Sequence, residues 1–251
     1  MSLQGRVAMV TGGGRGIGKG IAMALARDGA DVAIIYRRDE DAARQTAGEI
    51  VSLGSKAAIF AADLTDFDRI KVAVGEALQT FGKIDILVNN AGIASRGRTL
   101  MDTDMGELRR VIDSHVFGSF CFTQAVLPSM RQQPRGDIIF ISSVAVERLE
   151  ANGGPYSMAK CAMEAMATTL AKEERANNIR VNIVRPGLVE TDMGVRLAKA
   201  SMGVKDIKEL YAGSPFGRVG IPSDIGNTVA FLVSKGAEYI TRATISVSGG
   251  T

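Results

Sequence analysis

Tyr156 and Lys160 are the side chains whose type and spacing most directly indicate chemistry. They stand four positions apart in Tyr156-Ser157-Met158-Ala159-Lys160, and on a helix this spacing places both on one face, one turn apart. A phenol has an ordinary pKa of about 10, and a neighbouring ammonium group stabilises its phenolate form. Ser143 follows an apolar segment that ends at Ile141, which predicts a hydroxyl at the carboxyl edge of a sheet. A Tyr/Lys pair alone is also typical of surface packing, but with Ser143 and the glycine cluster described next it indicates acid–base chemistry.

A glycine cluster near the N-terminus is the second candidate for chemistry. Thr11-Gly12-Gly13-Gly14-Arg15-Gly16-Ile17-Gly18 lies between an apolar run and a helical pattern. Glycines allow a tight turn close to a diphosphate, and the following helix end offers free N–H groups. The spacing nearly fits a nucleoside triphosphatase loop, but Gly20 stands where that loop needs Ser or Thr for magnesium. The cluster therefore predicts a dinucleotide site, with an ordinary turn as the alternative.

The end of the second apolar run indicates which dinucleotide would bind. The run closes with Ile34-Ile35-Tyr36-Arg37-Arg38, and no carboxylate precedes Asp39. A carboxylate near this point would bind the ribose 2′-hydroxyl of NAD, whereas arginine can neutralise a 2′-phosphate. With Tyr36 at the strand end, Arg37 and Arg15 therefore predict a preference for NADP(H) over NAD(H). The alternative is that the arginines are solvated loop charges.

These side chains need a sheet with its helices on both faces to bring them together. Short apolar runs alternate with helical patterns, which predicts an α/β fold: a doubly wound, seven-stranded parallel sheet in a single Rossmann domain over residues 1–251. The expected strands are Val7–Val10, Asp31–Tyr36, Lys56–Ala61, Ile84–Val88, Asp137–Ile141, Ile179–Val184 and Thr244–Val247. The expected helices are Gly16–Arg27, Glu40–Ser52, Asp66–Phe81, Asp104–Met130, Ser157–Ala176 and Pro222–Ser234. Residues 189–220 interrupt the alternation, and such an insertion is typical of a substrate-binding loop or of a surface excursion.

Composition excludes several classes of site and partner. The chain has 251 residues, 46% of them hydrophobic, a single His and a formal net charge of +3. One His cannot build a multi-His metal centre, so no metal is expected. The positive charges are spread along the chain, which argues against nucleic acid or a membrane surface as a partner. With no signal-peptide pattern and no long apolar run, the expected location is the cytoplasm.

The order of these motifs resembles the short-chain dehydrogenase/reductase family along essentially the whole chain. The closing runs Phe216-Gly217-Arg218-Val219-Gly220-Ile221-Pro222 and Tyr239-Ile240-Thr241 resemble its 3-oxoacyl-[acyl-carrier-protein] reductase-like branch. The matching motifs are Thr11-Gly12, Gly16-Ile17-Gly18, Asp63-Leu64, Asn89-Asn90-Ala91-Gly92, Ser143, Tyr156, Lys160, Pro186-Gly187 and Thr191.

The resemblance implies a role for each matched residue. Tyr156 would be the general acid or base, Lys160 would lower its pKa and hold the nicotinamide ribose, and Ser143 would bind the substrate oxygen. Asp63 and Leu64 would bracket the adenine. Further cofactor contacts are expected from Asn90, Ala91, Gly92, Pro186, Gly187, Val189 and Thr191, and the family resemblance also implies a homotetramer or a dimer.

Two segments depart from the family pattern. His115, in Asp113-Ser114-His115-Val116-Phe117-Gly118, stands where the family carries a relay Asn that makes a local helix irregularity. His115 is predicted either to replace that Asn in a proton relay, with a pH dependence near its ordinary pKa of about 6.5, or to be a structural residue with a weakened relay. Val146-Glu147-Arg148-Leu149-Glu150 replaces a small, Gly-containing stretch, and its charges would either shape a pocket or be solvated.

The expected function is therefore NADP(H)-dependent interconversion of a ketone, such as a 3-oxoacyl thioester, and a secondary alcohol. A sugar, polyol or other secondary-alcohol dehydrogenase is the enzymatic alternative. A cofactor-binding regulatory protein with little turnover is the alternative from another class. A carrier protein could dock on Arg131, Arg135 or Arg196, although scattered surface arginines are the simpler interpretation.

Overall fold

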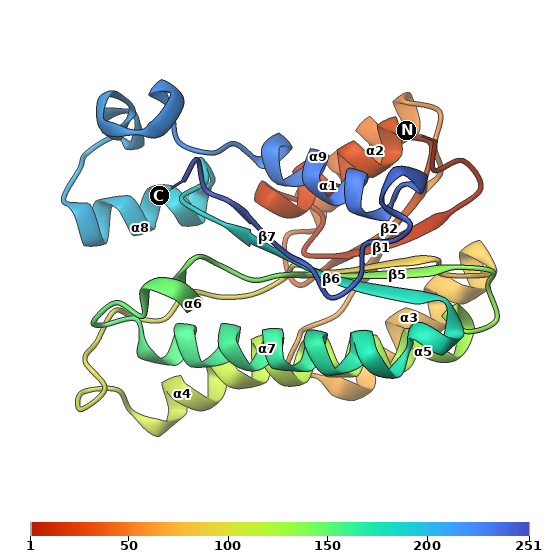
Figure 1. Ribbon diagram of the computed structural model, residues 1–251, viewed down its shortest axis with the longest axis horizontal. Coiled ribbons are helices and arrows are strands. Elements are labelled where there is room, and N and C mark those ends of the chain that lie inside the picture. The colour runs from red at the N-terminus through yellow and green to blue at the C-terminus, as the bar shows by residue number, and fades with distance from the viewer. Residues whose placement is uncertain (1, 251) are drawn as a thin grey trace.

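Seven parallel strands form one continuous sheet in the computed structural model, which describes residues 2–250 (Figure 1). The strand order is β3-β2-β1-β4-β5-β6-β7, so the order reverses between β1 and β4. In such sheets, ligands bind at the carboxyl ends of the strands beside this reversal. The strands are β1 (Val7–Thr11), β2 (Asp31–Tyr36), β3 (Ala57–Ala61), β4 (Ile86–Asn89), β5 (Gly136–Ile141), β6 (Ile179–Pro186) and β7 (Thr244–Val247).

Helices cover both faces of the sheet. In Figure 1, α1, α2 and α9 lie on one face, and α3, α5 and α7 lie on the other. The α-helices are α1 (Gly16–Arg27), α2 (Glu40–Ser52), α3 (Phe67–Phe81), α4 (Met105–Ile112), α5 (Gly118–Met130), α6 (Ala145–Arg148), α7 (Gly154–Glu173), α8 (Asp192–Met202) and α9 (Pro222–Val233). The other helical turns are the π-helix η1 (Asp113–Phe117) and the 3₁₀ segments η2 (Arg175–Asn177), η3 (Ile207–Gly213), η4 (Pro215–Gly217) and η5 (Lys235–Ala237).

The central strands β1, β4 and β5 are mostly apolar because both of their faces are buried. In β1, Val7 and Met9 join the core cluster that contains α3, α5 and α7, whereas Ala8 and Val10 join the cluster beneath α1 and α9. All five residues of β1 are buried. This two-sided burial explains why the strands show continuous apolar runs rather than alternation.

The predicted helices are correct in type but differ in continuity. The single helix expected over Asp104–Met130 is wrong, because η1 interrupts it between α4 and α5. A π-turn carries an extra residue per turn, which changes the direction of the side chains that follow. Helix α7 begins at Gly154 rather than Ser157, with Pro155 in its first turn, where a missing N–H costs nothing.

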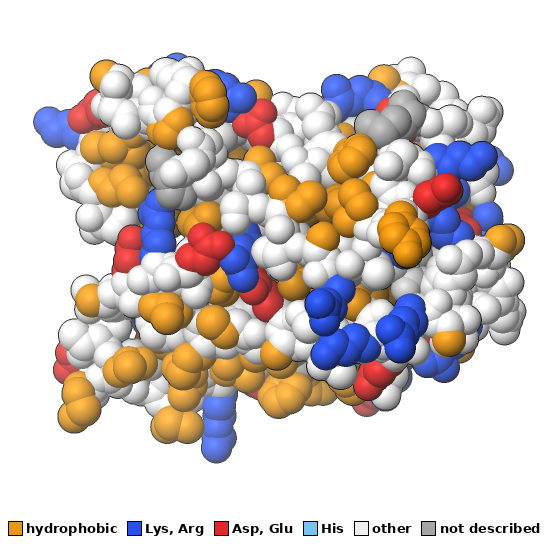
Figure 2. Space-filling model, viewed as in Figure 1, with side chains coloured by type: hydrophobic (Ala, Val, Ile, Leu, Met, Phe, Trp, Pro, Cys, Tyr) orange, Lys and Arg blue, Asp and Glu red, His pale blue; other side chains and the backbone are white. Residues whose placement is uncertain are grey.

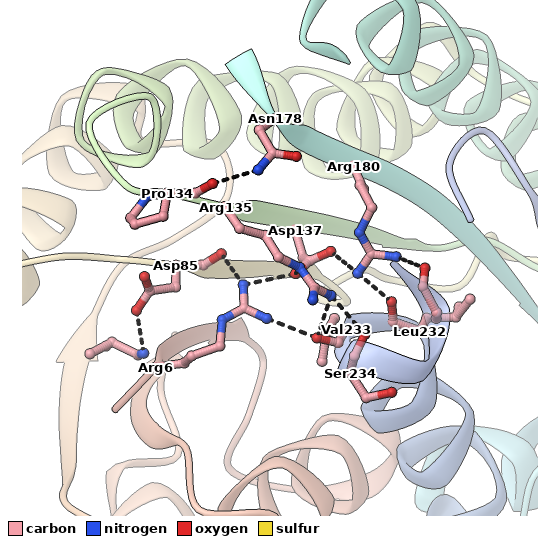
Figure 3. A network of polar contacts seen from close by, with 12 residues as sticks. Arg6, Asp85, Pro134, Arg135, Asp137, Asn178, Arg180, Leu232, Val233 and Ser234 are labelled. Carbon is pink, nitrogen blue, oxygen red and sulfur yellow. Dashed lines mark hydrogen bonds and ion pairs between the residues drawn. The ribbon is translucent and has the colours of Figure 1, made fainter. Parts of the chain in front are cut away.

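At the amino-terminal edge of the sheet, a buried ion cluster ties α9 to the strands (Figure 3). The side chain of Asp137 is 1% exposed. It forms ion pairs with Arg6 at 2.8 Å, with Arg135 at 3.1 Å and with Arg180. Arg6 and Arg135 both donate to the Val233 carbonyl at 2.8 Å. The arginines therefore satisfy carbonyl groups at the C-terminal end of α9, where cations are favoured.

Among residues 2–250, no helix is long and apolar enough to cross a membrane.

Candidate active site

The glycine turn between β1 and α1 has the geometry of a phosphate cradle. Gly12 has φ +66°, in the left-handed region that favours glycine. A Cβ atom on Gly18 would overlap the Gly12 carbonyl, so the turn closes only with glycine there. Arg15, the residue before α1, makes no side-chain capping bond to the first turn of the helix. The residues present therefore fit a dinucleotide diphosphate, which the free N–H groups and the close backbone can receive.

Thr11 and Asn90 fasten this turn to the end of β4. The Thr11 hydroxyl accepts the N–H groups of Asn90 at 2.9 Å and Ala91 at 3.0 Å. The Asn90 amide in turn donates to the Thr11 carbonyl at 2.8 Å. The predicted residues Asn90, Ala91 and Gly92 thus lie across the sheet reversal from the glycine turn, on the far side of the cradle.

The charges predicted to select the cofactor lie at the carboxyl ends of β2 and β3. Arg37 lies 3.9 Å from Asp63, and Arg15 lies 3.5 Å from Asp39, which caps α2. Burial acts to raise the pKa of Asp63, but the two hydrogen bonds from Thr65 and the nearby arginines outweigh it, and the pKa lies below its ordinary value. Both arginines are about half exposed or more. Their guanidinium groups are therefore accessible to a ligand at this edge.

Tyr156, Lys160 and Ser143 come together at the carboxyl end of β5. Lys160, which is 3% exposed, donates to the Ile141 carbonyl at 2.7 Å, and its Nζ lies 5.6 Å from the centre of the Tyr156 ring. Burial lowers the pKa of Lys160 to about 7. Burial also raises the pKa of Tyr156, while a hydrogen bond with Ser143 acts to lower it. The site therefore joins a phenol, a hydroxyl and a titratable ammonium group.

His115 reaches the same site from η1. Its ring packs edge-on against Tyr156, with 5.4 Å between ring centres. Its Nε2 lies 2.8 Å from the Ile93 carbonyl and 3.1 Å from the Ile93 nitrogen. Its Nδ1 is buried and has no hydrogen-bond partner among the described residues. A Cβ atom on Gly92 would overlap the imidazole, which explains glycine at that position.

The pH dependence expected for His115 near its ordinary pKa is wrong. Burial of the ring, together with the charge of Lys160, lowers the His115 pKa to about 3. The imidazole is therefore neutral throughout the range in which enzymes are assayed. Because the folded-state pKa is the lower one, the neutral ring stabilises the fold above pH ~6.5, and this contribution is lost as the pH falls towards 3.

Two His115 variants test a role as a neutral polar group. We expect His115→Asn to keep the wild-type pH–rate profile and most of the activity, because both side chains are uncharged and can bond water. We expect His115→Phe to lower kcat about 10- to 100-fold, the effect of losing one buried hydrogen-bonding group. An acidic limb that is present in the wild type and absent from His115→Asn would contradict this account.

The loop after β6 closes against the glycine turn. Thr191 caps α8 by accepting the Gly194 N–H at 3.0 Å, and its methyl group lies against Gly16. The predicted residues Pro186 and Gly187 lie at the end of β6 beside Val247 and Ser248 of the last strand and its extension. Val189 pairs with Gly220, so the two ends of the predicted loop meet. Between these ends the loop contains α8 and η3, packed on a small core of Ala198, Ile207 and Val219.

One polar group beside the site was missed from the sequence. Glu164 accepts hydrogen bonds from Ser142 and from Arg185, and Arg185 also pairs with Glu147. Glu164 lies one turn beyond Lys160 on α7, and Arg185 is a charged residue near the carboxyl end of β6. Extending the Tyr/Lys spacing by four residues could have found Glu164. In the charged segment 146–150, Glu147 pairs with Arg185 and Arg148 lies 3.7 Å from Glu150, and residues 147–150 are all exposed.

Comparison with known proteins shows similarity along the whole chain. Residues 12–251 match the family model described as enoyl-(acyl carrier protein) reductase. An uncharacterised oxidoreductase of Methylorubrum extorquens is 38% identical over 248 residues, covering 99% of this chain and 98% of that protein. A 3-oxoacyl-[acyl-carrier-protein] reductase of Staphylococcus aureus is 37% identical over 244 residues, covering 97% and 96%.

Solved structures agree in fold. A short-chain dehydrogenase of Burkholderia cenocepacia in complex with NADP has a TM-score of 0.90 and 32% identity, and the match covers 99% of this chain and 98% of that one. An NAD⁺-bound xylitol dehydrogenase has a TM-score of 0.91 and 28% identity, and the match covers all of both chains.

Proposed function

The chain belongs to the short-chain dehydrogenase/reductase family of oxidoreductases, which act on CH–OH or keto groups with NAD(P), and we propose that it interconverts a ketone and a secondary alcohol with NADP(H). The observation that carries this proposal is the placement of Tyr156 beside Lys160 and Ser143, at the edge of the sheet that also holds the glycine cradle. We propose Ser143, Tyr156 and Lys160 as the catalytic residues, with His115 as the neutral relay group.

In reduction, the Tyr156 hydroxyl donates its proton to the carbonyl oxygen, and the Ser143 hydroxyl holds that oxygen as negative charge develops. The ammonium group of Lys160 stabilises the phenolate that remains. A bound nicotinamide supplies the hydride in reduction and takes it up in oxidation. The cofactor would be held by the cradle residues Gly12, Arg15, Gly16, Ile17 and Gly18, and by Tyr36, Arg37, Asp63, Leu64, Asn90, Ala91, Gly92, Pro186, Gly187, Val189 and Thr191.

The exposed arginines beside Asp63 support NADP(H) as the preferred cofactor. We expect kcat/KM with NADPH to exceed kcat/KM with NADH at least about 10-fold. We expect Arg37→Gln to lower kcat/KM with NADPH about 10- to 100-fold, because one charge-assisted bond to the 2′-phosphate is lost. Arg27→Gln, an exposed arginine at the end of α1 away from the glycine turn, is the matched control. Equal or better use of NADH by the wild type would contradict the preference.

The loop favours an apolar ketone over a sugar or polyol. Met193, Leu197 and Met202 of α8 are each 41–53% exposed. Carrier-protein docking through Arg131 and Arg135 gains no support, because Arg131 pairs with Glu174 and Arg135 is part of the Asp137 cluster at the opposite edge. A panel of aliphatic, aromatic and 3-oxoacyl ketones, with polyols in the oxidative direction, tests this choice. Faster turnover of polyols would establish the alternative.

The exposed apolar side chains around α4 and α7 support a homo-oligomer, a tetramer or a dimer. Leu100, Met101, Met105, Leu149 and Met158 are each at least 43% exposed. Figure 2 shows hydrophobic side chains gathered at the lower left, over α4, α6 and α7. Exposed apolar side chains gathered in this way are typical of a protein interface. A single domain over residues 1–251, residues 189–220 as the substrate loop and a cytoplasmic location remain predictions.

A further inference from the structure

Glu164 continues the line of functional side chains along α7. Tyr156, Lys160 and Glu164 stand at successive four-residue intervals, so they share one face of the helix. Lys160 donates to the carbonyl of Ile141, and Ser142 donates its hydroxyl hydrogen to Glu164 at 2.6 Å. The two α7 side chains therefore hold two consecutive residues at the end of β5, and the next residue is Ser143.

Arg185 connects Glu164 to the other segments that form the site. Its Nε and Nη2 atoms reach the two carboxylate oxygens of Glu164 at 2.7 and 2.5 Å, a bidentate pair in which both side chains are less than 20% exposed. Its remaining nitrogen pairs with Glu147 on α6. Arg185 immediately precedes Pro186 in β6. One ion cluster thus joins the Ser143 turn, α7 and the end of β6.

The charge on Lys160 depends on few neighbours. Along α7 these are Tyr156 and Glu164, and from η1 there is the neutral His115 ring. From β6 and α6 the charged groups are Arg185 and Glu147, both held in the Glu164 cluster. From α4 the buried carboxylate is that of Glu107, which is engaged with Arg96.

Among these groups, Glu164 is the one that opposes the effect of burial on Lys160. Burial lowers the pKa of Lys160 to about 7, and the Glu164 carboxylate acts to raise it. Arg185 neutralises part of that carboxylate charge through the bidentate pair. The balance between Glu164 and Arg185 therefore bears on the charge of a lysine that makes no ion pair of its own among the described residues.

We propose that Glu164 and Arg185 are positioning residues that together set the charge of Lys160 and hold the strand end that carries Ser143. This inference rests on the proposed function, because it assigns the pair a role in the Tyr156 reaction. It predicts that removing Glu164 and removing Arg185 shift the titration of Lys160 in opposite directions. Loss of Glu164 leaves Arg185 as a positive charge near Lys160, and loss of Arg185 leaves the Glu164 carboxylate less neutralised.

The test compares Glu164→Gln, Arg185→Met and the double variant with the wild type and with Glu173→Gln, an exposed position on the same helix. For ketone reduction, the alkaline limb of the kcat profile should move to lower pH in Glu164→Gln and to higher pH in Arg185→Met. Each shift should be about one pH unit, the smaller end of the range for a nearby charge. The double variant should return the limb close to its wild-type position, and Glu173→Gln should not move it.

A measurement without substrate separates this inference from the proposed function. In protein labelled with ¹³C at lysine Cε, the Lys160 signal is assigned by its absence from Lys160→Met, and its titration should show the same opposite shifts. If the wild type reduces no ketone, the proposed function fails while the Lys160 titration still decides the role of the pair. Titration shifts in the same direction for both single variants, or no shift in either, would overturn the inference and leave the ion pair a purely structural clamp.

Discussion

Tyr156→Phe should lower kcat for ketone reduction by about 10²- to 10⁴-fold, the range observed when a positioned acid or base is lost. The substitution removes one hydroxyl group and keeps the ring that packs against His115. The group that donates the proton is then absent, while the glycine cradle, which lies on a different element, is unchanged. Stopped-flow measurement of NADPH oxidation under saturating ketone gives the effect on the chemical step.

Two controls make the Tyr156→Phe result specific. NADPH binding, followed by nucleotide fluorescence, should change less than about 3-fold, because the substitution leaves the groups that bind the nucleotide in the ground state in place. Tyr211→Phe removes a phenol of the loop that bonds Glu190 at 2.8 Å, and it should keep most of the turnover. A Tyr156→Phe protein with undiminished kcat would show that the proton comes from another group.

Asp137→Asn should be the most destabilising single substitution at the amino-terminal edge of the sheet. It leaves Arg6, Arg135 and Arg180 without the buried carboxylate that all three contact. Breaking a buried ion pair from one side costs about 3–5 kcal/mol, because the remaining charge stays desolvated. Urea unfolding at fixed protein concentration measures the loss in the free energy of unfolding.

The matched control is Asp68→Asn, which breaks an exposed pair with Lys71. Because its carboxylate is 94% exposed, the loss should be below about 1 kcal/mol. Equal losses in the free energy of unfolding for the two substitutions would contradict the view that the Asp137 cluster stabilises the attachment of α9 to the sheet. In proteins that remain folded, kcat should be preserved, since this cluster lies at the edge opposite Tyr156.

The sheet could be predicted because its signal is local. Strands β1, β4 and β5 are buried on both faces and therefore read as apolar runs, and glycine follows β1 where the turn requires it. The interruption of the helix at η1 has a weaker signal, since the residues 113–117 are compatible with either an α- or a π-turn. The family resemblance pointed to a helix irregularity at the Asn that His115 replaces, but the helix was still expected to run unbroken over Asp104–Met130. The helices inside 189–220 were also missed, because they bury only a small core.

The sequence allowed the identities of the site residues to be predicted, but not the burial and the neighbours of their side chains. Four-residue spacing places Tyr156 and Lys160 on one face, but only the fold shows that burial lowers the Lys160 pKa to about 7 and the His115 pKa to about 3. The Glu164–Arg185 pair joins residues 21 positions apart, and it depends on the packing of α7 on β6. The buried Asp137 cluster likewise joins strand starts to α9, which no spacing along the chain reveals.

The central claim is hydride transfer between a nicotinamide nucleotide and a carbonyl carbon beside Tyr156. Its most direct test is reduction of the best ketone of the panel with NADPH deuterated at nicotinamide C4, with each face labelled in turn. Mass spectrometry should find one deuterium atom on the carbinol carbon of the product from one labelled face, and Tyr156→Phe should form this labelled product about 10²- to 10⁴-fold more slowly. NADPH consumption with no deuterium in the alcohol from either face, or no consumption with any ketone or alcohol of the panel, would contradict the account.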